Sequence, residues 1–176
     1  MPNYDLPNPA PEPLRLVQLF VNTIDREHMR EWLSTPAELA AWYREHGLEV
    51  GRPRAADLEQ AVALREAFRA LLRANNHGPA AAGAYDVVNE VARGHVTAEV
   101  RDGSVALVGR RALGQITAVA LGAMLDGSWP RLKVCRNCEW SFYDYSKNRA
   151  ASWCSMQLCG NRLKTRAYRR RRAQPA

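Results

Sequence analysis

The sequence predicts a mostly helical α+β protein: a helical body with one β-hairpin, followed by a small carboxyl-terminal unit of a hairpin and a basic helix. Three observations support this prediction. Apolar residues recur at helical spacing through most of the first 126 positions, one segment alternates around an Asp-Gly turn, and all four cysteines lie within residues 135–159. An apolar fraction of 47% in 176 residues suffices for one compact domain, or for one domain with an appended module.

The amino-terminal residues 1–13 contain five prolines, which predict an extended arm rather than a packed element. An apolar-rich helix is expected to follow over Leu14–Ile24. Near its end, Asn22 and Thr23 have two interpretations: they line a polar ligand pocket, or their side chains form hydrogen bonds at the helix end. We expect the second, and keep the pocket as a possible ligand site.

A second helix is predicted to begin at Ser34-Thr35-Pro36. Thr35 is the expected N-cap, Pro36 fits the first turn, and Glu38 completes a capping box. Gly47 is expected to end this helix. Its larger apolar side chains, Leu39 and Trp42, are expected in the core.

The strongest helical pattern spans residues 57–76, where the apolar side chains form one stripe about 140° wide. The stripe consists of Leu58, Ala61, Leu64, Phe68, Leu71 and Leu72. The opposite side, predicted to be solvated, carries Glu59, Glu66, Arg69 and Arg73. A further helix is predicted over residues 81–93, with Tyr85, Val88 and Ala92 facing inward.

Alternation replaces helical periodicity between residues 95 and 108, where Asp102-Gly103 supplies a tight turn. We therefore predict a β-hairpin there. The next segment, residues 111–126, is apolar on most sides and is expected to form a helix at the centre of the body. Gly-Ser-Trp-Pro at residues 127–130 ends it and marks the boundary of the carboxyl-terminal unit.

The cysteines form two close pairs, Cys135-x2-Cys138 and Cys154-x4-Cys159. Two thiol pairs on either side of a short insert are typical of a structural zinc site, since zinc prefers four soft ligands in a tetrahedron. Four cysteines leave no open coordination position, so we predict one structural Zn²⁺ and no catalytic metal. A disulfide framework is disfavoured because no signal peptide opens the chain, and a thioredoxin-like redox pair because no βαβ unit is apparent.

The insert between the cysteine pairs predicts a strand over residues 139–145 and a turn near Lys147-Asn148. Small zinc modules have little other core, so Trp140, Phe142 and Trp153 are expected to shield the metal. For Tyr143 and Tyr145, packing is favoured over stacking on bases.

Charge is distributed unevenly between the two parts of the chain. Residues 1–130 hold 13 Lys and Arg against 16 Asp and Glu, whereas residues 131–176 hold 12 against two. A mildly acidic body thus carries an end with a net charge of +10, which favours a polyanionic partner, nucleic acid above all. A partly disordered basic tail is the alternative for the last few residues.

The segment after Cys159 is predicted to form a basic helix. Such a helix fits a DNA major groove, and its guanidinium groups would bind phosphates and guanine edges. The candidate nucleic-acid-binding residues are Arg162, Lys164, Arg166, Arg169 and Arg170. Coordination of Cys159 would fix the direction of this helix.

These residues resemble a known pair of domains. Trp140-Ser-Phe-Tyr-Asp144, Trp153-Cys-Ser-Met156 and Cys159-Gly-Asn-Arg162 resemble the CGNR zinc finger of bacterial proteins, and Phe20-Val-Asn-Thr23 with Thr35-Pro-Ala-Glu-Leu39 resembles the ABATE domain. The resemblance covers residues 12–172 and implies an ABATE-like domain over 14–128 and a treble-clef-like finger over 131–172. It also implies a stress-induced transcription regulator whose finger binds DNA. Many relatives carry a basic pair before the Trp-Cys step, where this chain has Ala150-Ala-Ser152.

The sequence therefore favours a zinc-dependent DNA-binding regulator whose body forms a homodimer or senses a small-molecule effector. We expect a bacterial cytoplasmic, nucleoid-associated protein without a membrane partner, since no apolar run reaches about 18 residues. RNA binding is the nearest rival interpretation, because phosphate attraction does not distinguish the two polymers. Two further hypotheses are a basic helix that docks on an acidic protein and an enzyme in the helical body, although no catalytic motif is recognisable there.

Overall fold

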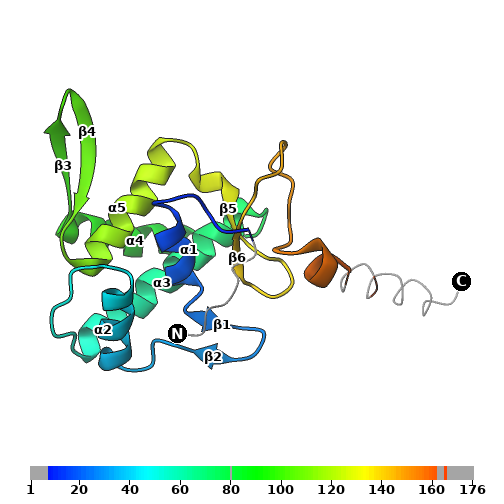
Figure 1. The fold of residues 1–176 in the computed structure, drawn as a ribbon, viewed down its shortest axis with the longest axis horizontal. Helices are drawn as coiled ribbons and strands as arrows, with labels where there is room; N and C mark the ends of the chain where they lie inside the picture. The colour runs from blue at the N-terminus through cyan, green and yellow to red at the C-terminus, as the bar shows by residue number, and fades with distance from the viewer. Residues whose placement is uncertain (1–7, 80, 162–164, 166–176) are drawn as a thin grey trace, which may run out of the picture.

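In a computed structural model of the chain, residues 8–79, 81–161 and 165 are described. Helices form the body, and the strands occur in antiparallel pairs: β3 and β4 project at one end, and β5 and β6 lie on the side towards the carboxyl terminus (Figure 1). The predicted mostly helical α+β class is confirmed. No helix in the described part of the chain is long and apolar enough to cross a membrane.

The first helix, α1 (Arg15–Val21), is shorter than predicted. The chain leaves it into a small antiparallel pair, β1 (Ile24–Asp25) with β2 (Arg30–Glu31). The cause is local: Thr23 Oγ1 donates to the carbonyl of Phe20 at 2.8 Å, and this side-chain bond ends the helical turn.

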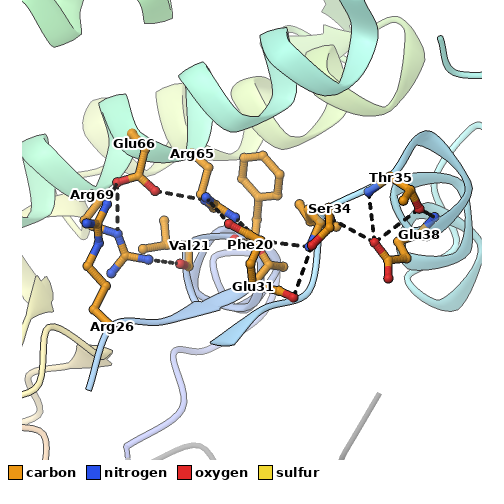
Figure 2. A network of polar contacts seen from close by, with 12 residues as sticks. Phe20, Val21, Arg26, Glu31, Ser34, Thr35, Glu38, Arg65, Glu66 and Arg69 are labelled. Atoms are coloured by element: carbon orange, nitrogen blue, oxygen red, sulfur yellow. Dashed lines mark hydrogen bonds and ion pairs between the residues drawn. The ribbon is translucent and has the colours of Figure 1, made fainter. Parts of the chain in front are cut away.

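The second helix, α2 (Pro36–Glu45), begins as the sequence predicts. The Glu38 amide donates to Thr35 Oγ1 at 3.2 Å, and the Thr35 amide donates to Glu38 Oε2 at 2.9 Å, which completes the capping box (Figure 2). Gly47 follows with a φ of +66°. Leu39 and Trp42 are buried, as expected.

The central helix, α3 (Ala55–Asn75), buries most of the predicted apolar stripe; Leu58 is half-buried. The prediction that Arg69 belongs to a solvated face is wrong, because only 1% of the residue is exposed. Its Nη1 donates to the carbonyl of Glu139 at 2.8 Å and its Nη2 donates to the carbonyl of Val21. Figure 2 shows Arg69 beside Val21 and Glu66, between α3 and the segment that follows α1.

The fourth helix, α4 (Ala82–His95), has a buried face rotated from the predicted one. Val88 and Val91 are buried, whereas Tyr85 is 55% exposed and Ala92 half-buried, so the inward placement of Tyr85 is wrong. The helical period is as predicted, but Val91, rather than Ala92, marks the centre of the face that packs on α3 and α5.

The predicted hairpin is confirmed as β3 (Val96–Arg101) paired with β4 (Ser104–Gly109). Asp102 and Gly103 both have positive φ, 49° and 76°, as a two-residue hairpin turn requires. Next, α5 (Arg111–Leu125) packs on α1, α4 and β4 at the centre of the body, as predicted, and its last residue is exposed.

After α5, the short 3₁₀ helix η1 (Trp129–Arg131) leads into β5 (Leu132–Val134), which pairs with β6 (Ser141–Tyr143). The predicted strand exists, but it is shorter and buried on all three residues. Leu132, Val134 and Tyr143 belong to the same hydrophobic core as the helices, and β5 packs on α3. The core of the body therefore continues into the cysteine-rich segment.

The amino-terminal arm is described over residues 8–13 and forms no helix or strand there, with a bend at Asn8 (φ of 52°) and a turn that begins at Glu12. The expectation that the arm is not a packed element is wrong. Ala10 is 4% exposed and lies in the main core. The carbonyl of Asn8 accepts from the Tyr143 amide at 2.9 Å, and the carbonyl of Pro9 accepts from the Tyr145 hydroxyl at 2.7 Å. Proline removes only a backbone donor, so a proline-rich segment still offers carbonyl acceptors to the strand beside it.

Candidate metal centre

The four cysteine sulfurs gather in one place although the two pairs are separated by a fifteen-residue insert. All four residues are buried, and their sulfur atoms lie within 4.8 Å of one another. Cys154 Sγ lies 3.5 Å from Cys138 Sγ and 3.6 Å from Cys159 Sγ. The structure thus brings together all four predicted metal ligands.

The spacing of the sulfurs fits a zinc ion. Four thiolates at about 2.3 Å from one tetrahedral centre are about 3.8 Å apart, close to the two separations above. A disulfide requires about 2.0 Å, and all four thiols are free. The cluster fits one structural zinc ion with no open position.

The pKa shifts of the clustered thiols also indicate a bound cation. A hydrogen bond with Cys135, together with burial, raises the pKa of Cys154, and a hydrogen bond with Cys135 also raises the pKa of Cys138. The hydrogen bond from Cys138 lowers the pKa of Cys135. Without a cation, four adjacent buried thiols cannot all ionise. A divalent cation removes this conflict and allows the four negative charges to coexist.

The first cysteine pair lies on the turn between β5 and β6. The Cys135 amide donates to the carbonyl of Trp140 at 2.9 Å, and the Glu139 amide donates to the carbonyl of Cys135 at 3.1 Å. Glu139 has a φ of 61°, a left-handed conformation that closes the turn so that both thiols face the same side. The hairpin therefore encloses the first pair, rather than lying between the two pairs.

In the second pair, Cys154 precedes a short helical turn, η2 (Met156–Gly160), and Cys159 lies within it. Ser155 caps it: its Oγ accepts from the Leu158 amide at 3.3 Å, and its carbonyl accepts from the Cys159 amide at 3.0 Å. A Cβ added at Gly160 would lie 2.8 Å from Met156 Sδ, so this position needs glycine while Met156 keeps its place. Asn137 Nδ2 donates to Cys159 Sγ at 3.5 Å and connects the two pairs.

Aromatic side chains shield the cluster as predicted. Phe142 is fully buried against the cysteines, and Trp140 and Trp153 pack against them while partly exposed. Tyr143 packs in the core, whereas Tyr145 is 62% exposed, although its hydroxyl is bonded to the arm. In the described structure, packing therefore accounts for Tyr143.

A buried ion pair that no sequence pattern indicated organises the loop before the second pair. Lys133 Nζ lies 2.7 Å from Asp144 Oδ2, and both side chains are at most 2% exposed. Lys133 also donates to the carbonyls of Arg149 and Ala151, and Asp144 Oδ2 accepts from the Ala151 amide. Burial alone would raise the pKa of Asp144, but the hydrogen bonds from Lys133 and Ser146, together with the charge of Lys133, outweigh it and lower that pKa.

Side chains of the body hold the finger in place. Asn22 exchanges two hydrogen bonds with the backbone of Ser141, and Asn76 Nδ2 donates to the carbonyls of Val134 and Ser152 at 2.8 and 3.1 Å. Arg136 of the finger donates in return to the carbonyl of Asn76. No sequence motif distinguishes these asparagines from ordinary helix-end residues.

The predicted pocket residues have structural partners. Both polar atoms of the Asn22 side chain bind Ser141, and Thr23 Oγ1 binds Phe20 and accepts from Arg65 at 3.3 Å. Hydrogen bonding, the interpretation that the sequence favours, accounts for both residues.

The predicted nucleic-acid-binding residues Arg162, Lys164, Arg166, Arg169 and Arg170 lie outside the described residues. Their described neighbours Asn161 and Thr165 are both helical. Thr165 Oγ1 donates to the carbonyl of Asn161 at 2.9 Å, a hydrogen bond across one helical turn.

Comparison with known proteins agrees with this geometry. Residues 14–128 match the ABATE family, described as "Putative stress-induced transcription regulator", and residues 131–172 match the CGNR zinc finger. No curated protein matches the chain. The ABATE match alone covers more than half of the 176 residues. The chain therefore belongs to the ABATE family of regulators and carries a CGNR zinc finger at its carboxyl end.

Proposed function

We propose that this chain is a zinc-dependent, DNA-binding transcription regulator that responds to stress. The observation that carries the proposal is the charge step at the finger: residues 131–176 have a net charge of +10 beside a body of −3. A concentrated positive charge next to an acidic body attracts a polyanion and orients it towards one end of the protein. The regulatory family supplies the class of function.

The described cations of the finger divide into two groups. Arg131, Lys133 and Arg136 donate to backbone carbonyls of the protein and so maintain the fold. Lys147 and Arg149 are exposed, on the loop before Cys154. This loop holds Ala150-Ala-Ser152, where many relatives carry a basic pair, so we expect DNA binding by this chain to depend more on the terminal arginines.

We assign most of the DNA contacts to Arg162, Lys164, Arg166, Arg169 and Arg170. The cationic segment follows Cys159 within three residues, so zinc coordination at Cys159 fixes where that segment starts. Guanidinium groups bind phosphate through paired N–H donors and can contact guanine edges in the major groove. The finger thus positions the cationic segment, and the arginines of that segment bind the DNA.

A salt titration tests this proposal. In a fluorescence-anisotropy assay with duplex DNA, the logarithm of affinity should fall linearly with the logarithm of salt concentration, with a slope of about −0.9 per phosphate contact. The triple variant R162Q/R166Q/R169Q should reduce the magnitude of the slope by about 2–3. The matched control, R44Q/R93Q/R101Q, removes the same charge from exposed positions of the body and should leave the slope close to that of the unmodified protein.

The same assay tests the RNA-binding and protein-binding hypotheses. Tighter binding of structured RNA than of duplex DNA at fixed salt would favour an RNA-binding protein. A flat salt response, with loss of a protein partner in the finger variant, would favour an acidic protein partner. The proposal also includes a non-catalytic role, a homodimer, a small-molecule effector and association with the nucleoid.

A further inference from the structure

The helical body contains a cavity whose lining residues are distant in sequence from the zinc finger and include no proposed DNA contact. It has a volume of about 400 Å³ and lies where the loop between α2 and α3 meets the start of α5. Glu49 attaches this loop to α5: its amide donates to Gln115 Oε1, and its Oε2 accepts from the Arg111 amide, both at 3.1 Å. A cavity of this size accommodates a small metabolite.

Tyr43 supplies an unused donor in this cavity. The residue is only 6% exposed and lines the cavity, yet its hydroxyl has no hydrogen-bond partner among the described residues. Its ring is fixed by edge contact with Trp42. Burial, and then the Asp57 carboxylate, raise the pKa of Tyr43, so the hydroxyl stays protonated at neutral pH. The Tyr43 hydroxyl is not one of the fully buried side-chain atoms that lack a partner in the described structure, so it is open to the cavity, where the acceptor of a ligand can reach it.

Positive charge surrounds the same cavity. Arg52, Arg54 and Arg111 line it, against the two carboxylates of Glu49 and Asp57. Both carboxylates are engaged: Glu49 caps the first amide of α5, and Asp57 accepts from the Arg54 amide at 2.8 Å. Arg52 and Arg111 have no side-chain partner among the described residues. The cavity therefore offers guanidinium donors and a phenol, beside the Gln60 amide and the His95 imidazole, which can each donate or accept.

Apolar groups complete the lining. Pro53, Ala112 and Leu113 also face the cavity. The polar and apolar parts together suit a ligand with an oxyanion at one end and a flat or apolar body at the other. The amino-terminal ends of α3 and α5 both face this region, and their dipoles add to the preference for negative charge.

We infer that this cavity binds a small organic oxyanion, a carboxylate or a phosphate monoester with an apolar body, held by Arg52, Arg111 and the Tyr43 hydroxyl. The ligand site is independent of the proposed DNA contacts, since none of its residues belongs to the finger. In a regulator, this cavity would be an effector site. Oxyanion binding at the cavity and DNA binding by the finger are tested by separate experiments.

The test is a two-dimensional ¹H–¹⁵N NMR titration of the full zinc-loaded chain with benzoate, phenyl phosphate and inorganic phosphate. A residue-resolved readout is needed because the basic carboxyl-terminal segment also attracts anions. We expect saturable shifts at the amides of Gly51, Arg52 and Arg111. The tighter of the first two ligands identifies carboxylate or phosphate, and inorganic phosphate should bind more weakly because it lacks an apolar body.

Matched variants locate the contacts. Y43F, which removes only the hydroxyl, should weaken binding about fivefold, and R52Q about tenfold, since charge-assisted hydrogen bonds are the stronger ones. The controls Y85F and R93Q make the same changes at exposed positions of α4 and should bind like the unmodified protein. All four proteins should keep the unmodified DNA affinity in the absence of ligand.

Two results would overturn the inference. Shifts confined to the finger, or equal losses in R52Q and R93Q, would mean that the anions respond only to general positive charge. No saturable shift at the cavity with any of the three probes would remove the site altogether. Neither result bears on DNA binding, which the finger variants test.

Discussion

Asn22 at the end of α1 and Ser141 in β6 exchange two buried hydrogen bonds across 119 residues of sequence. The Ser141 amide donates to Asn22 Oδ1 at 2.8 Å, and Asn22 Nδ2 donates to the Ser141 carbonyl at 3.1 Å. Gln18 Nε2, one turn earlier in α1, donates to the same carbonyl. The strand that follows the first cysteine pair is thus held by the first helix of the body.

Replacing Asn22 by Ala is expected to lower the free energy of unfolding by about 2–4 kcal/mol, because two hydrogen bonds are lost and the buried Ser141 amide is left without a partner. Urea denaturation followed by circular dichroism measures this. Asn89→Ala, at an exposed position of α4, is the matched control and should change stability by less than about 0.7 kcal/mol. Equal effects in the two variants would show that the Asn22–Ser141 contact contributes little.

Removing zinc is expected to release residues 153–161 first and to leave β5 and β6 folded. The later segment packs mainly on the cysteine cluster, whereas Leu132, Val134 and Tyr143 lie in the core of the body. Hydrogen exchange of the full chain, with and without a chelator, should show lost protection in 153–161 only. Chelator saturated with zinc beforehand is the control. Simultaneous loss of protection in β5 and β6 would contradict this order.

Replacing the buried Arg69 by Met should cost about 3–5 kcal/mol of stability, because the carbonyls of Val21 and Glu139 lose their donors and Glu66 loses a cation. Arg73→Met, one turn along α3, is the matched control. The Arg73 side chain is 38% exposed and pairs with Glu139 at 3.0 Å, so its loss should cost no more than about 1 kcal/mol. Similar costs for both variants in urea denaturation would argue against the buried role of Arg69.

Glu66 gives a pH dependence with a definite sign. Burial would raise the pKa of its carboxyl, but Arg69 and Arg65, then Arg26, outweigh burial and lower it. A carboxyl group whose pKa is lowered by folding stabilises the folded state at any pH above its pKa in the unfolded chain, about 4.3. This stabilisation is lost as the pH falls through the lower pKa of the folded state. At pH 7, Glu66→Gln should therefore cost about 1–3 kcal/mol, between the values for exposed and buried pairs.

The measurement for Glu66 is the difference in unfolding free energy between the unmodified protein and Glu66→Gln from pH 7 to pH 3. Acid release of zinc affects both proteins and cancels in the difference. The difference should shrink below about pH 4. A difference that stays constant over this range would show that the charge of Glu66 is not the source of its stabilisation. Glu59→Gln, another carboxylate of α3 on its exposed side, is the control.

Features that depend on near neighbours in the chain could be predicted from the sequence. The Thr35–Glu38 capping box, the Asp102-Gly103 turn and the apolar stripe of α3 all form as predicted, because each arises from residues within a few turns of one another. The cysteine spacing likewise predicts the four-sulfur cluster, since the two thiols of each pair are only a few residues apart in the chain. Shielding of the cluster by Phe142 also follows from the scarcity of other core there.

Which polar side chains are buried could be learned only from the folded chain. Arg69 and Glu59 both lie on the helix side that the sequence assigns to solvent, yet distant carbonyls from α1 and the zinc hairpin surround Arg69 alone. The roles of Asn22, Lys133 and Asp144, and the cavity around Tyr43, depend in the same way on partners brought together by folding. Periodicity records the hydrophobicity of a position, but the free energy of a buried charge depends on which donors and acceptors the rest of the chain places beside it.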